Sequence, residues 1–194
     1  MGTVRIVCTT GPESTGKTTL CRALARRFGV PWLAEYAREH LTASGDGTAP
    51  GAAGYDRGTV TTIAREQWQR ERALLERTEG PVVLDTDLAV LFVWWQEKYG
   101  AVPRWIDQAW ASQAPRLYLL CRPDIGWHPD PLRETPHDLD RLFGIYGDLL
   151  TERGLQFVEI HGTGDARTAA AVQAAMPILS LRPRSRGASP PLAR

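Results

Sequence analysis

Residues 11–18 read GPESTGKT, a match to the pattern G-x-x-x-x-G-K-[ST]. An apolar, strand-like run precedes the motif at residues 4–8, and a helix-like run follows it at residues 19–28. In this setting the two glycines let the backbone curl so that successive N–H groups point at phosphate oxygens. The lysine ammonium then reaches the β- and γ-phosphates, and the threonine hydroxyl ligates Mg²⁺. The sequence therefore predicts a P-loop that binds a nucleoside triphosphate.

The alternative interpretation of this motif is a glycine-rich turn between a strand and a helix. Composition argues against it, because the chain has only two lysines, Lys17 and Lys98, beside twenty-one arginines. One of those two lysines falls where a P-loop requires it. The residues expected to bind the triphosphate are Gly11, Glu13, Ser14, Thr15, Gly16, Lys17, Thr18 and Thr19.

Short apolar runs alternate with longer periodic runs along the chain, which is typical of an α/β parallel sheet. Strands are expected at residues 4–9, 31–34, 82–85, 117–121 and 157–160. Helices are expected to begin at Lys17 and near Tyr36, Val60, Leu88, Asp138 and Asp165. We therefore expect an α/β fold of the P-loop NTPase type, with a parallel sheet of about five strands flanked by helices.

The chain length predicts one domain over residues 1–180 and a basic, proline-rich tail at 181–194, for which we expect disorder. Two internal segments fit no regular element. Residues 44–55 are rich in Gly, Ala and Pro and are expected to form a loop over a ligand. Residues 122–137 are charged and interrupted by prolines, and they lie where small P-loop kinases carry a lid.

Net charge bears on the kind of binding partner, and cysteine spacing bears on metal binding and on the state of the thiols. A net charge of +1 gives no electrostatic reason to expect nucleic acid or a membrane surface. The three cysteines, Cys8, Cys21 and Cys121, show no metal-binding spacing and are expected to be reduced thiols in the core. Without a recognisable signal peptide or membrane span, we expect a cytoplasmic protein.

Ligands of parallel sheets collect beyond the carboxyl ends of the strands, so acidic residues at those positions are the candidates for chemistry. Asp85 closes an apolar run and fits a Walker-B carboxylate that holds Mg²⁺ beside Thr18. Asp85 or Asp87 could instead cap the helix that begins at Leu88.

Transfer of a phosphoryl group to an alcohol also needs a carboxylate that orients the hydroxyl and accepts its proton. Glu35 and Asp87 are both candidates for this base. The alternative for Glu35 is an exposed position in a first helical turn, paired with Arg38.

The segment at 122–137 offers cations for the transferred phosphoryl group. Arg122, Arg133 and Arg141 are the candidates, and Arg133 stands out because Trp127 and Asp130 flank it. A ring, a carboxylate and a guanidinium on one loop suit a ligand with an aromatic ring, a diol and a phosphate.

Taken together, the ordered motifs GPESTGKT, EYARE, IAREQ, DTD and LYLLCRPDIGWHPDPLR resemble the nicotinamide riboside kinase domain of the NadR type. The resemblance runs from about Val4 to Ala175. It implies that an ATP-dependent phosphotransferase converts nicotinamide riboside to nicotinamide mononucleotide at the 5′-hydroxyl, a step of NAD salvage, with ATP and Mg²⁺ bound. Because the P-loop begins at residue 11, we expect no upstream adenylyltransferase domain.

The resemblance also implies roles for individual residues. It places Tyr36 and Trp127 near the substrate, Asp85 and Asp87 near the metal and the ribose, and Arg133 over the phosphates. With the residues argued above, the expected catalytic set is Lys17, Glu35, Asp85, Asp87 and Arg133, and the expected metal ligands are Thr18 and Asp85. One departure from the family pattern is Pro131, where a glycine is expected. The residues expected at the nucleoside are Glu35, Tyr36, Arg38, Asp87, Trp127 and Asp130.

Two other functions remain open. One is a related kinase that acts on another nucleoside or on a nucleic-acid 5′-hydroxyl, and the other is a regulatory ATP-binding module. A GTP switch is excluded, because guanine recognition in that class uses an N-K-x-D motif and this chain contains no asparagine.

Overall fold

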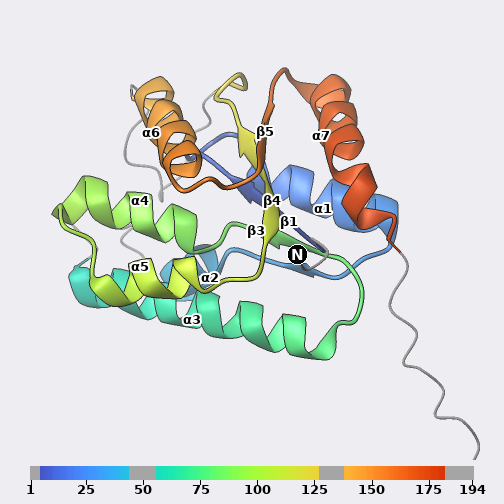
Figure 1. Cartoon of the computed structure of the whole chain (residues 1–194). Helices are drawn as coiled ribbons and strands as arrows, with labels where there is room; N and C mark the ends of the chain where they lie inside the picture. Colours follow the sequence, from blue (N-terminus) through green and yellow to red (C-terminus); the bar gives the residue numbers. More distant parts are fainter. Residues whose placement is uncertain (1–4, 44–55, 127–137, 182–194) are drawn as a thin grey trace, which may run out of the picture.

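The computed structural model describes residues 5–43, 56–126 and 138–181 of the chain. Five parallel strands form one sheet in the order β2-β3-β1-β4-β5 (Figure 1). This confirms the expected P-loop NTPase type of fold. The strands are β1 (Ile6–Thr10), β2 (Trp32–Leu33), β3 (Val82–Asp85), β4 (Arg116–Cys121) and β5 (Phe157–Ile160).

Seven helices flank the sheet within the described part of the chain. Six of them begin at or within about three residues of an expected start. The helix that the sequence pattern missed is α5, which has only eight residues and thus little more than two turns of periodicity. The helices are α1 (Lys17–Phe28), α2 (Tyr36–Ala43), α3 (Arg57–Arg77), α4 (Leu88–Tyr99), α5 (Arg104–Ala111), α6 (Leu139–Glu152) and α7 (Gly164–Leu179).

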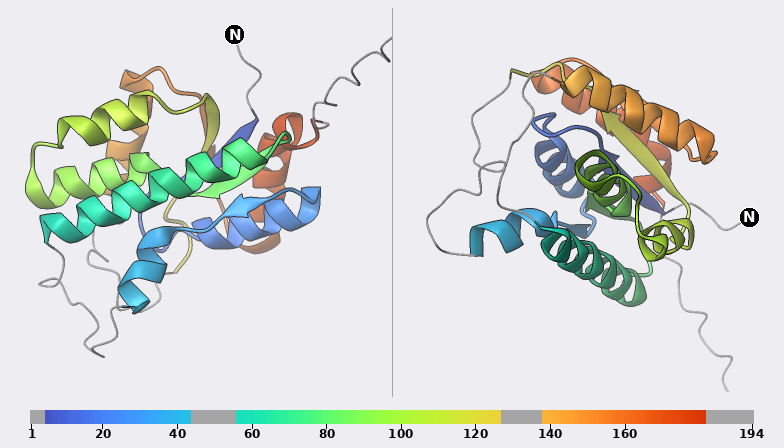
Figure 2. Two further views of the ribbon diagram at one scale, coloured as in Figure 1. Left: turned by 90° about the horizontal axis from the view of Figure 1, so that it is seen from below. Right: turned by 90° about the vertical axis from the view of Figure 1, so that its left-hand side faces the viewer.

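The two faces of the sheet carry separate apolar cores, because successive strand residues point to opposite faces. Ile6 and Cys8 of β1 join the cluster under α3, α4 and α5, whereas Val7 joins the cluster under α1 and α7. Figures 1 and 2 show these two helical layers on opposite sides of the sheet. The three cysteines are free and buried, as expected, and burial raises the pKa of Cys121 to about 11.

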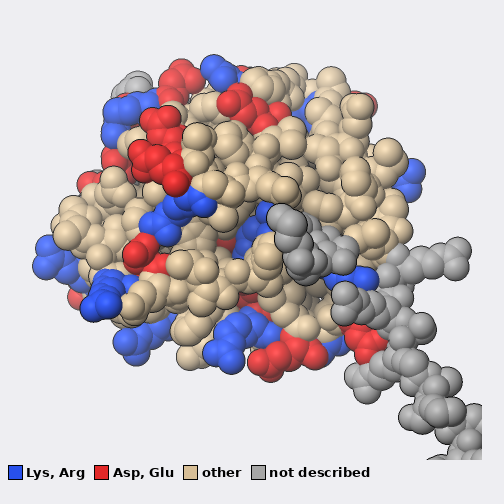
Figure 3. Space-filling model, in the orientation of Figure 1, with Lys and Arg blue, Asp and Glu red and all other residues tan. Residues whose placement is uncertain are grey.

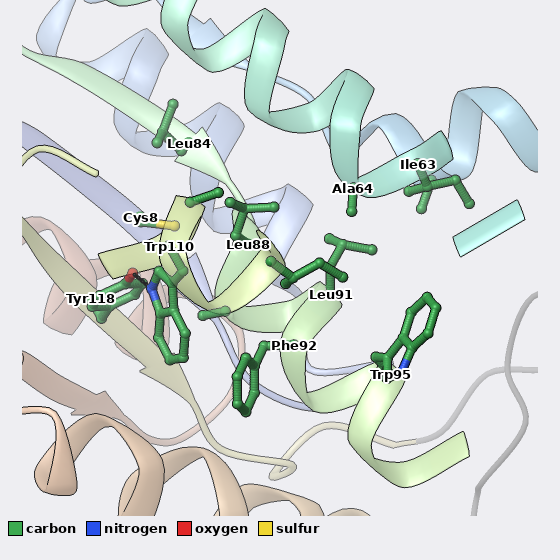
Figure 4. Close-up of a cluster of buried hydrophobic side chains, with 14 of the residues drawn as sticks. Cys8, Ile63, Ala64, Leu84, Leu88, Leu91, Phe92, Trp95, Trp110 and Tyr118 are labelled. Atoms are coloured by element: carbon green, nitrogen blue, oxygen red, sulfur yellow. Dashed lines mark hydrogen bonds between the residues drawn. The ribbon is translucent and has the colours of Figure 1, made fainter. Parts of the chain in front are cut away.

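A polar network crosses the larger of these cores. Arg116 of β4 donates to both carboxylate oxygens of Glu71 on α3, at 2.8 and 3.2 Å, and to Asp87 Oδ2 at 3.0 Å. The side chains of Arg116 and Glu71 are each 2% exposed. Tyr118 donates to the same Asp87 oxygen at 2.7 Å and accepts a hydrogen bond from Trp110, which is drawn in Figure 4. One guanidinium thus compensates two buried carboxylates and ties α3 and the end of β3 to β4.

Two expected segments, 44–55 and the tail at 182–194, lie outside the described residues, as does 127–137 of the expected lid. None of the helices in the described ranges combines the length and the apolar character that a membrane crossing requires.

Replacement of Arg116 by methionine is expected to destabilise the fold by about 3–5 kcal/mol, because it leaves two carboxylates buried without a cation. The free energy of unfolding in urea measures this. The control is Arg72→Met, since Arg72 is 61% exposed, pairs with Glu76 on the surface and lies over the ring of Trp68. That change is expected to cost no more than about 1 kcal/mol, and equal losses in the two variants would contradict the role assigned to the network.

Candidate active site

The loop between β1 and α1 has the tight backbone that the motif predicts. Gly11 has φ of 120°, and a Cβ at this position would lie 2.9 Å from the carbonyl oxygen of Cys121. Gly16 has φ of 75° and caps the N-terminus of α1. Only glycine combines the left-handed conformation with so close an approach of a neighbouring strand. Gly11 is therefore required by the position of β4 as well as by the turn, whereas Gly16 is required by its left-handed backbone.

Side chains of the loop donate hydrogen bonds to carbonyl oxygens of the same loop. The Lys17 ammonium donates to the carbonyl oxygens of Gly11 at 3.0 Å and Pro12 at 2.5 Å. Thr15 Oγ1 also donates to Pro12 O, at 2.9 Å. These hydrogen bonds hold the Lys17 ammonium over the loop at the N-terminus of α1. The helix dipole also favours an anion at this position, so both charges attract a phosphate.

A buried arginine on α7 anchors the P-loop. Arg167 of α7 is 4% exposed, and its guanidinium donates to Thr15 O at 2.9 Å, Arg122 O at 2.8 Å and Gly162 O at 3.0 Å. The nearest carboxylate is that of Asp124, whose Oδ2 lies 3.9 Å from Nη1 and accepts from Gly162 N. Arg167 therefore joins the P-loop to the ends of β4 and β5. No sequence pattern identifies Arg167, because it lies in an alanine-rich helix more than a hundred residues from the P-loop.

Asp85 lies at the end of β3 beside the P-loop and is 1% exposed. Thr9 Oγ1 donates to Asp85 Oδ1 at 3.4 Å, and the Thr18 hydroxyl lies beside the carboxylate. Burial raises the pKa of Asp85, while Thr18 and the charge of Lys17 oppose the rise. A hydroxyl and a carboxylate oxygen next to a phosphate-binding loop match the oxygen ligands that Mg²⁺ prefers.

Asp87 does not take the position expected of a base or a ribose ligand. It is fully buried, its Oδ1 accepts from Ala89 N at 2.9 Å, and Oδ2 is used by Arg116 and Tyr118. Asp87 therefore caps α4, which is the alternative that the sequence left open, and anchors the network under the site. Between the two carboxylate candidates for the base, the structure leaves Glu35 near the P-loop.

A cavity of about 600 Å³ opens over the P-loop. Residues 11–18 line one side of it, and Glu35 and Arg38 approach from the end of β2 and the first turn of α2. The opposite wall comes from α4 and the first half of α6. Its lining residues there include Val90, Val93, Trp94, Glu97, Lys98, Arg141, Leu142 and Tyr146.

Some expected residues lie elsewhere. Tyr36 does not line this cavity: its ring lies against Arg70 of α3, with the guanidinium carbon 4.1 Å from the ring centroid. Thr19 is exposed on α1. The expected lid residues Trp127, Asp130 and Arg133 lie outside the described residues.

Sequence analysis did not identify the cavity wall formed by α4 and α6. The exception is Arg141, which was a candidate cation for the transferred phosphoryl group. Arg141 pairs with Glu97 and with Asp138 Oδ2, so it connects α6 to α4 at the cavity. Trp94 and Lys98 give no separate signal, because α4 is apolar on nearly all sides and its periodicity does not distinguish a cavity wall from a core.

Comparisons with known proteins agree with this fold. The family model described as AAA domain matches residues 6–167. A NadR protein in complex with NR superposes with a TM-score of 0.76 at 22% identity, over 95% of this chain and 54% of that one. A NadR protein in complex with NAD and AMP-PNP gives 0.72 at 22% identity, over 94% and 51%. Deoxyadenosine kinase from M. mycoides gives 0.61 at 10% identity, over 90% and 98%.

These likenesses concern the fold, and they confirm at that level the resemblance seen in the sequence. The chain spans about half the length of the NadR proteins that it matches. No curated protein sequence gives a significant match.

Replacement of Arg167 by methionine is expected to weaken ATP binding by about tenfold or more, because three carbonyl groups lose their donor and the loop loses its anchor. Isothermal titration calorimetry of each variant with ATP measures the effect. Arg26→Met on the exposed face of α1 is the control and is expected to leave the affinity unchanged. Wild-type affinity in Arg167→Met would show that the loop holds its shape without the anchor.

Proposed function

Since the chain belongs to the AAA domain family over residues 6–167, a range that includes the P-loop, Glu35 and Asp85, we propose that it is an ATP-dependent kinase that phosphorylates the 5′-hydroxyl of nicotinamide riboside to nicotinamide mononucleotide. The observation that carries the proposal is that Lys17 and Glu35 line one cavity. Nucleotide binding requires the P-loop alone, whereas a carboxylate facing the same space provides for an acceptor.

In the proposed reaction the chain orients both substrates and moves one proton. The N–H groups of the P-loop and the Lys17 ammonium hold the triphosphate, with Lys17 exchanging the Gly11 and Pro12 carbonyl oxygens for phosphate oxygens. The 5′-oxygen bonds to the γ-phosphorus while the bond from that phosphorus to the bridging oxygen of ADP breaks. Glu35 orients the hydroxyl and accepts its proton.

A divalent cation fits the site. Thr18 and Asp85 would hold Mg²⁺ through the hydroxyl and carboxylate oxygens that already face one another. When bound, the ion supplies positive charge to the β- and γ-phosphates. Arg141 and Lys98, which line the cavity, would add cations near the transferred group.

Two features support nicotinamide riboside as the acceptor. The wall formed by Val90, Val93 and Trp94 is apolar and aromatic, which suits a flat ring that carries a positive charge. The NadR protein that matches over most of this chain was crystallised with NR. A polynucleotide acceptor is less well supported, because acidic and basic side chains are interspersed over the face in Figure 3 and the net charge is only +1.

The deciding experiment is a coupled assay of ADP release with ATP, Mg²⁺ and a panel of acceptors. The panel holds nicotinamide riboside, common ribo- and deoxyribonucleosides and a 5′-hydroxyl oligonucleotide. We expect strong stimulation by nicotinamide riboside. Stimulation by another compound would show that the protein is a kinase with a different acceptor. Stimulation by none of the compounds would favour a regulatory ATP-binding module.

Glu35→Gln is expected to lower kcat by about 10²–10⁴-fold, because the amide cannot accept the hydroxyl proton. The ATP affinity should stay near that of the wild type, since the P-loop is untouched. Glu39→Gln, four residues further along on α2, is the matched control: this side chain is 59% exposed and pairs with Arg70 outside the cavity. If both variants keep wild-type kcat, Glu35 is not the base.

Trp94→Leu is expected to raise the KM for the acceptor by about tenfold, because the cavity loses one face of the aromatic wall. The KM for ATP should change little, as Trp94 lines the cavity from α4 and is not part of the P-loop. Trp105→Leu on α5, outside the cavity lining, controls for the loss of a half-buried tryptophan. A parallel rise in both KM values would argue against a ring site at Trp94.

A further inference from the structure

One buried glutamine connects the two strand ends that carry the candidate carboxylates. Gln67 lies on α3 and is 1% exposed. Its Oε1 accepts a hydrogen bond from the backbone N–H of Tyr36 at 2.8 Å, and its Nε2 donates to the carbonyl oxygen of Thr86 at 3.4 Å. A single side chain thus joins the start of α2 to the turn after β3.

Both partners of Gln67 are sequence neighbours of site residues. Tyr36 follows Glu35 and is the first residue of α2, where the backbone N–H has no partner within the helix. Thr86 follows Asp85 and has φ of 70°, a left-handed conformation that is unfavourable for a β-branched residue. Such a conformation persists only where the surroundings hold it in place. The hydrogen bond to Thr86 O is one of those restraints.

We propose that Gln67 is a positioning residue that fixes the spacing between Glu35 and Asp85, and thereby directs the phosphoryl group to the bound acceptor. The inference rests on the proposed kinase function of this site. An uncharged amide side chain carries its donor and its acceptor on separate atoms, so that one glutamine can bridge two backbone groups. Because β2 and β3 are neighbours in the sheet, α3 spans both of their ends with this one side chain.

The rest of the turn has its own anchor one helical turn along α3. Glu71 binds Arg116, and Arg116 binds Asp87. Residues 85–87 are therefore held at Thr86 by two hydrogen bonds, one from Gln67 to Thr86 O and one from Thr86 N to Thr9 O at 3.2 Å, and at Asp87 by the ion-pair network. The P-loop is held separately by Arg167. Loss of Gln67 should consequently change the spacing between the two carboxylates while leaving the triphosphate site in place.

The test compares Gln67→Met with Gln113→Met. Methionine keeps the length of the side chain and removes both polar groups. Gln113 is a matched control, because its amide donates to Glu71 at 2.9 Å and contacts neither strand end. We expect Gln67→Met to lower kcat by about 10–100-fold with little change in the KM for ATP, since small misplacements of reacting groups have effects of this size.

A second readout separates positioning from loss of stability. With a misplaced acceptor, water competes for the γ-phosphoryl group, so the ratio of ADP formed to acceptor phosphorylated should rise above one in Gln67→Met. A variant that is merely less stable loses both products in parallel. Gln67→Asn, which is too short to span both partners, is expected to behave in the same way if the methionine variant folds poorly. Unchanged kcat and ratio in an active enzyme would overturn the inference.

The role of Gln67 can also be tested without an acceptor, so that this test does not depend on which substrate the protein uses. Hydrogen exchange followed by mass spectrometry should show faster exchange in peptides covering residues 34–38 and 84–88 in Gln67→Met but not in Gln113→Met. If no acceptor is phosphorylated by the wild type, the proposed function fails. Faster exchange in both peptides still upholds the bridge in that case, and unchanged exchange refutes it.

Discussion

The parallel pairing of β1 with strands on both sides is the constraint on which the site depends. Thr9 lies opposite Asp85 of β3, and Thr10 lies opposite Leu120 of β4. Because all three strands run in the same direction, the P-loop, the candidate metal carboxylate and the end of β4 emerge at one edge of the sheet. The same register brings β4 so close to the loop that residue 11 must be glycine.

Buried charges and amides then hold these strand ends in place. Arg167 joins the P-loop to the ends of β4 and β5, Arg116 joins Asp87 to Glu71, and Gln67 joins Thr86 to Tyr36. Each of these side chains satisfies several partners, which is the condition under which a polar group is tolerated in a protein core. Their common effect is to fix loops that would otherwise be the least ordered parts of the sheet.

Local sequence was enough to predict most of the fold and half of the site. The pattern of the P-loop depends on neighbouring residues alone, and so do the apolar strand runs and the helix that begins at Lys17. The second half of the cavity was not predictable in this way. Trp94 and Lys98 face it only because α4 packs across the carboxyl edge of the sheet, and no periodicity within α4 encodes that position.

By itself the sequence determined a P-loop α/β protein with acidic residues at two strand ends, because motif and periodicity are properties of short segments. The tertiary structure alone decided which acidic residue reaches the P-loop. Asp85 and Asp87 are two positions apart in the sequence, yet the left-handed turn at Thr86 separates them, so that one meets Thr18 and the other is buried with Arg116. Which partner a carboxylate finds depends on residues brought together by folding.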